Sequence, residues 1–184
     1  MLSKTFKSLI AISLLGSCAT AANALDVESY ENLANNTIRQ MNSGVVGDID
    51  AMIAIQEQLI ILGMEGGINY LQKSPKGGTP LKLVIENAES MKSLSLDEIE
   101  TLWHAGEYLK NKGIDQEKID HFGPMMSLMD SVIHPATSYL LMKEYKRTGN
   151  PDLLVRVKAE LYEVLEHIKH VDDGHDQVQL TSNE

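Results

Sequence analysis

NPDLLVRVKAELYEVLEHIKHV, residues 150–171, decides the fold class of this chain. Asn150 is a typical N-cap. Pro151 suits the first helical position, because the amide there makes no hydrogen bond within the helix and proline has no amide hydrogen. Apolar side chains then recur every three or four residues, the period of one face of an α-helix. The stretch predicts an amphipathic helix whose buried stripe is Leu154, Val157, Leu161, Val164, Ile168 and Val171.

The rest of the chain repeats this pattern in segments separated by glycine, proline and asparagine, without a convincing strand. Asp26 and Asp48 each suit the start of a long helix, and Ser95 starts a shorter one with a capping box. A further long helix runs over residues 124–147, and Pro135 inside it is expected to kink it beside the Ser131 carbonyl. These segments predict an all-α fold, a helical bundle of four long amphipathic helices and one or two short ones.

Two expectations concern the buried faces of these helices. The helix that follows Asp48 is apolar most of the way round, so we expect it to be the most buried one. On the helix that follows Ser95, Trp103 lies on the apolar face. Glu100, His104 and Glu107 lie opposite that face and are expected to be exposed.

The N-terminus has the organisation of a bacterial-type signal peptide. Lys4 and Lys7 precede the short apolar run Leu9–Leu15, and small residues follow as far as Ala24. The apolar run is too short to cross a bilayer as a mature helix, so we expect no membrane span there. The pattern predicts a protein that is exported to the periplasm or secreted.

Two processing routes compete for this leader. Cleavage after Ala24 leaves a soluble protein, whereas the lipobox-like sequence that ends at Cys18 would leave a protein anchored by lipid at that cysteine. For the first route we expect a signal peptide over residues 1–24, a single helical-bundle domain over residues 25–174, and a polar tail over residues 175–184.

Charge and cysteine content exclude several classes of function. The chain has 26 acidic and 16 basic residues, a net charge of −10, so phosphate backbones repel it and nucleic acid is excluded as a partner. Cys18 is the only cysteine. A chain cut after Ala24 therefore has no disulfide, no thiolate metal site and no covalent haem attachment. The expected partner is a protein or a small ligand.

One candidate metal site lies on the last predicted helix. Glu163, His167 and His170 fall on one side of that helix at spacings of four and three residues. Carboxylate and imidazole groups at such spacings can hold Zn²⁺ or Cu²⁺ together. The alternative is a solvated face without a ligand.

A second candidate lies around the start of the preceding helix. His121, Met125 and His134 combine imidazole and thioether groups, which ligate copper or the iron of haem b. The alternative is an irregular core in which methionine fills space beside a proline kink.

The sequence lacks the motifs of common enzymes: it has no G-x-S-x-G, no H-E-x-x-H and no phosphate-binding glycine loop. No enzyme class is indicated. We therefore predict an exported, acidic helical module that acts by binding or interaction. The alternative function is a helical bundle that binds a metal or non-covalent haem through His, Met and Glu side chains.

Overall fold

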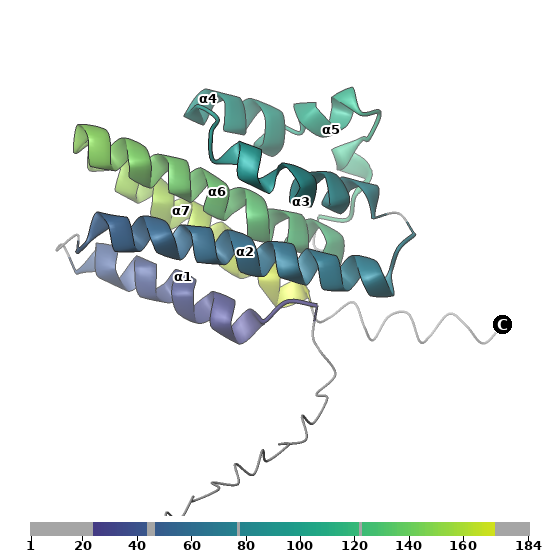
Figure 1. Ribbon diagram of the computed structural model, residues 1–184, viewed down its shortest axis with the longest axis horizontal. Coiled ribbons are helices and arrows are strands. Elements are labelled where there is room, and N and C mark those ends of the chain that lie inside the picture. Colours follow the sequence, from purple (N-terminus) through teal and green to yellow (C-terminus); the bar gives the residue numbers. More distant parts are fainter. Residues whose placement is uncertain (1–23, 44–46, 77, 122, 172–184) are drawn as a thin grey trace, which may run out of the picture.

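Figure 1 shows the computed structural model of the chain, which describes residues 24–43, 47–76, 78–121 and 123–171. Every regular element within these residues is a helix, which confirms the predicted all-α bundle. The predicted leader up to residue 23, including Cys18, and the predicted tail lie outside the described residues. The elements are α1 (Val27–Asn42), α2 (Ile49–Lys73), α3 (Thr79–Met91), α4 (Leu96–Ile99), a π-helical turn (Glu100–His104), α5 (Glu107–Asn111), a 3₁₀ turn (Gln116–Lys118), α6 (Pro124–Thr148), α7 (Asp152–His167) and a second 3₁₀ turn (Ile168–His170).

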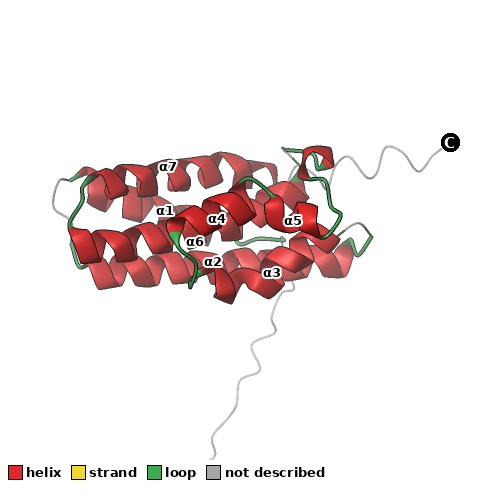
Figure 2. Cartoon of the chain, turned by 90° about the horizontal axis from the view of Figure 1, so that it is seen from above, coloured by secondary structure: helices red, strands yellow, loops and turns green. Residues whose placement is uncertain are grey.

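Four long helices, α1, α2, α6 and α7, form the bundle (Figure 1). Helix α6 packs along α2 and α7 and also contacts α3, while α1 packs against α2 and α7. The short helix α4 also contacts α6, and α4 and α5 face the viewer when the molecule is seen from above (Figure 2). Helix α6 is therefore covered on several sides, and its polar residues are enclosed by protein.

The most buried helix is α6, which corrects the expectation that α2 would be. Every residue from Met126 to Ser138 is buried, including Asp130 and His134. Helix α2 has an outer face, on which Ile61 and Ile68 are 51% and 42% exposed. An apolar sequence does not decide burial by itself, because burial depends on how many neighbours surround a helix. Among the described residues, α2 is also the one helix that is long and apolar enough to cross a membrane, a criterion that core helices of soluble proteins meet as well.

Helices α1, α2 and α6 meet at the backbone position that Pro135 leaves without a donor. Proline has no amide hydrogen, so the carbonyl of Ser131 lacks its usual helical partner. The hydroxyl of Tyr30 on α1 donates to that carbonyl oxygen at 2.9 Å. Gly63 on α2 lies beside it, where an added Cβ would be 2.8 Å from the carbonyl carbon of Ser131. The proline thus creates an acceptor that ties α1 to α6, and glycine allows α2 to approach.

The predicted helix starts are confirmed where a side chain caps the helix. Asp26 accepts the backbone N–H of Ser29, Asp48 accepts two such groups, and Ser95 forms the predicted capping box with Glu98. For α7 the predicted start is shifted by one residue: the helix begins at Asp152 with Pro151 in the N-cap position, and Asn150 accepts the backbone N–H of Asp152 at 3.1 Å. These caps satisfy amide donors that the first helical turn leaves unpaired.

The first described residues already belong to the core. Leu25, the residue expected to follow signal-peptide cleavage, is 1% exposed. It packs against Gly66 of α2, where an added Cβ would be 3.1 Å from the Leu25 Cα. The predicted mature chain therefore begins with a residue that anchors its N-terminus to α2.

Candidate metal centre

Two facing helices place four ionisable side chains in the interior. On α6, Asp130 and His134 are four residues apart and lie on the same face. On α7, Glu160 and His167 are two turns apart and lie on the face that packs against α6. Together with His104 from the π-helical turn, these residues form what we call the histidine cluster.

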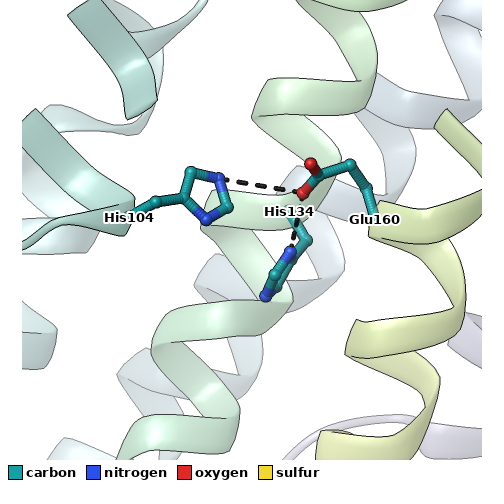
Figure 3. A group of neighbouring side chains, drawn as sticks. All are labelled: His104, His134 and Glu160. Carbon is teal, nitrogen blue, oxygen red and sulfur yellow. Dashed lines mark hydrogen bonds and ion pairs between the residues drawn. The ribbon is translucent and has the colours of Figure 1, made fainter. Parts of the chain in front are cut away.

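His134 lies between two carboxylates. Its Nδ1–H donates to Oε2 of Glu160 at 2.8 Å, because an ionised carboxylate can only accept (Figure 3). Its Nε2 lies 4.0 Å from Oδ1 of Asp130. The other carboxylate oxygen of Asp130 accepts a hydrogen bond from Nδ1 of His167. The imidazole of His134 thus has a carboxylate at each ring nitrogen.

His104 belongs to the same cluster, which corrects the expectation that it is exposed. Residues 100–104 form a π-helical turn, in which the amide of Ala105 donates to the Glu100 carbonyl at 2.9 Å. The wider turn shifts the helical phase and brings His104 inward beside buried Trp103. The Nε2 of His104 lies 3.7 Å from Oε2 of Glu160 and 2.8 Å from Oγ1 of Thr137 (Figure 3).

The proton on His104 follows from the partners of Thr137. The hydroxyl of Thr137 donates its single hydrogen to the Ile133 carbonyl at 3.1 Å. Its oxygen therefore accepts from His104, so Nε2 of His104 carries a hydrogen in the metal-free protein. A metal ion on this nitrogen would replace that hydrogen.

A small cavity of about 110 Å³ adjoins these side chains. Glu163 and His121 also line it, and both are exposed, so they lie where the cavity meets the surface. The ring of His121 is 5.0 Å from that of His167, edge to face. The full lining is Trp103, His104, Gln116, His121, Met126, Asp130, Ile133, His134, Glu163 and His167.

Gln116, another residue that lines this cavity, has an unpaired side-chain oxygen that packs against Gly106. Its Oε1 is buried and has no hydrogen-bond partner among the described residues. The amide packs on Gly106, whose φ of +72° and lack of a Cβ leave the space that the amide occupies. A buried acceptor without a donor is destabilising.

The carboxylates determine the charge on His134. Burial lowers the pKa of His134. The hydrogen bond that His134 donates to Glu160 and the negative charges of Asp130, Glu160 and Glu163 outweigh burial, so the pKa of His134 lies above its ordinary value. Burial, followed by the charge of Asp130, also raises the pKa of Tyr30 well above its ordinary value, which keeps the phenol a hydrogen-bond donor.

The cluster contains two sets of ligand atoms suited to a metal ion. In the inner group, Asp130, His134 and His167 are all buried and place one ligand atom each within 4.8 Å of the others. In the outer group, His104, His134 and Glu160 place their ligand atoms equally close together, and His104 and Glu160 are partly exposed. A tetrahedral ion with bonds of about 2.0–2.2 Å holds its ligand atoms roughly 3.3–3.6 Å apart, so small side-chain shifts suffice.

The structure brings together residues from both sites expected from the sequence. His167 and Glu163 of the first set line the cavity with His121 and His134 of the second set. His170 and Met125 are not among its lining residues, and Met126 lines it instead. The cavity has room for an ion and a few waters, whereas a porphyrin needs several times this volume. The residues present thus fit zinc or copper better than haem b.

Asp130, Glu160 and His104 are members of the cluster that sequence reasoning missed. Asp130 could have been recognised from the sequence, because it is the one Asp, Glu, Lys or Arg between Pro124 and Met142, in a helical segment rich in apolar residues. A charge in such a helix indicates a buried partner. No comparable feature of the sequence pointed to His104, since its inward position depends on the π-helical turn.

No family model, curated protein or solved structure matches this chain in the comparisons.

Proposed function

We propose that this protein binds a divalent transition-metal ion in the inner group. The observation that carries the proposal is the burial of Asp130, His134 and His167 with their ligand atoms within 4.8 Å of one another. Burying a carboxylate with two imidazoles is costly unless the charge is paired, and a bound cation pairs it.

The donor atoms favour zinc and copper. Imidazole nitrogen suits Zn²⁺, Cu²⁺ and Ni²⁺, and one carboxylate oxygen completes a three-residue set with a position left for water. Glu160 then acts on the ion through His134, since its hydrogen bond fixes the orientation of that ring. We propose that the ion is bound by the protein in its folded state and adds to the stability of the bundle.

We also propose that the ion is bound outside the cytoplasm. The support is the predicted leader, together with a chain that has no cysteine after Ala24. Imidazole and carboxylate ligands withstand an oxidising compartment in which thiolates are oxidised. The intact mass of the exported protein should match a chain that begins at Leu25, or a lipidated chain that begins at Cys18. An intact Met1 would contradict export.

Calorimetric titration tests the inner group. With Zn²⁺ at about pH 7.5, where free imidazole is mostly neutral, the wild type should bind far more tightly than millimolar, roughly −4 kcal/mol. His167→Ala removes one buried ligand and should weaken binding by more than tenfold. His170→Ala is the matched control from the same part of the chain, and it should bind as the wild type does.

Three outcomes of the titration contradict the proposal. The first is a wild type that binds Zn²⁺ no more tightly than millimolar. The second is superimposable isotherms for the wild type and His167→Ala. The third is an equal loss of affinity in His167→Ala and His170→Ala. The protein would then be a binding or interaction module without a metal, and the cluster a hydrogen-bonded network.

A further inference from the structure

The imidazole of His134 faces a different ligand group at each of its two nitrogens. Nδ1 faces Glu160 of the outer group, at 2.8 Å, and Nε2 faces Asp130 of the inner group, at 4.0 Å. We propose that the outer group holds a second divalent ion and that His134 bridges the two ions. This inference rests on the proposed function, because it requires an ion in the inner group.

The outer group is a ligand set in its own right. Its ligand atoms come from three different elements: His104 from the π-helical turn, His134 from α6 and Glu160 from α7 (Figure 3). Oε2 of Glu160 lies 2.8 Å from Nδ1 of His134 and 3.7 Å from Nε2 of His104. An ion in contact with all three atoms needs shifts of a few tenths of an ångström to about one ångström.

The position of His104 indicates that Glu160 is a ligand of a second ion and does more than orient the ring of His134. A carboxylate that only orients a metal-bound imidazole needs no further imidazole on its far side. Here His104 lies on that side, in a π-helical turn, a feature that often occurs at functional sites. Its side chain is 23% exposed and that of Glu160 is 14% exposed, so solvent reaches this end of the cluster.

Charge balance also favours two ions. An ion binds an imidazole nitrogen that carries no hydrogen, so the first ion binds Nε2 of His134. The second ion displaces the proton on Nδ1, which is released to solvent. Two divalent cations then face the carboxylates of Asp130, Glu160 and Glu163 and the anionic ring of His134. The formal charges are equal when the exposed carboxylate of Glu163 is counted, and such pairing lowers the cost of burying the two cations.

Copper is the probe that reports a bridge directly. After equilibration with Cu²⁺ and removal of excess ion, the wild type should retain two ions per chain. Unpaired electrons on two Cu²⁺ ions joined by one imidazole ring couple, so the paramagnetic resonance intensity should be well below that expected for the copper retained. His104→Ala should retain one ion and show the full intensity of an isolated Cu²⁺.

Two further variants complete the test. His170→Ala is the control and should retain two coupled ions. Glu160→Gln preserves size and removes the outer carboxylate, so it should also retain one ion, even if His104→Ala does not fold. Circular dichroism establishes helical content for each variant before the titration.

The outcomes separate this inference from the proposed function. If the wild type and His104→Ala each retain one isolated ion, the second site is overturned, whereas the proposed ion in the inner group stands. Two ions in both the wild type and His104→Ala also overturn it. Retention of no ion by the folded wild type contradicts the proposed function itself, and with it the second site.

Discussion

His134 is buried with a carboxylate at each ring nitrogen, and this position links its charge to the stability of the metal-free protein. Asp130, Glu160 and Glu163 raise its pKa above the ordinary value although burial opposes them. The folded protein therefore keeps the proton to a higher pH than the unfolded chain does. In the proposed metal centre, the same carboxylates would face an ion bound to His134.

The metal-free protein should lose stability as pH rises through the folded-state pKa of His134. The stabilising contribution of this proton is fully present below the unfolded pKa of about 6.5 and disappears at higher pH, because the native state binds more protons there. Urea unfolding in the presence of a chelator measures the effect. His134→Gln should show a flatter decrease in the free energy of unfolding above about pH 6.5, whereas His170→Gln should follow the wild type. Equal slopes for wild type and His134→Gln would show that this proton is not coupled to folding.

Helix α6 shows how one proline organises its neighbours at the level of the element. Pro135 leaves the Ser131 carbonyl without a helical donor, Tyr30 supplies one, and Gly63 lets α2 approach the same point. The position of the freed carbonyl follows from the sequence, because it is set by the helical repeat. Its partner does not, since Tyr30 is 101 positions away.

Gly63→Ala should destabilise the protein even though alanine is the better helix former. Alanine gains about 1 kcal/mol in helix propensity, but its Cβ would meet the backbone of Ser131, which cannot move aside as a side chain can. We expect a net loss of about 1–3 kcal/mol in the free energy of unfolding, measured with urea. Glu65→Ala, at an exposed site on the same helix, should stay within about 0.5 kcal/mol of the wild type. A more stable Gly63→Ala variant would mean that α2 and α6 are not in close contact.

The starts of the helices and their apolar faces could be predicted from the sequence, because they depend on residues that are close together in the chain. Asp48 and Ser95 cap their helices as local rules require, and α7 begins within one residue of the predicted start. The phase of the segment that carries His104 could not be predicted, because a helical wheel assumes a constant turn and residues 100–104 form a wider one. One π-helical turn therefore changed an expected surface residue into a member of the cluster.

At the scale of the whole molecule, the candidate site could be predicted only in pieces. The sequence indicated His167 and Glu163 on one helix, and His121 and His134 in another segment. That these segments meet at one cavity depends on how α6 and α7 pack, which no single stripe specifies. The same limit explains the misjudged burial of α2: periodicity shows which face of a helix is apolar, but not how many helices surround it.

The position of a bound ion is the most direct test of the proposed site. Crystals grown with Zn²⁺ and measured at the zinc absorption edge locate the ion by anomalous scattering, independently of affinity. We predict a peak inside the bundle, with Asp130, His134 and His167 at about 2.0–2.2 Å from it. Zinc found solely on surface residues such as His170, with no peak within bonding distance of His134, would contradict the metal centre.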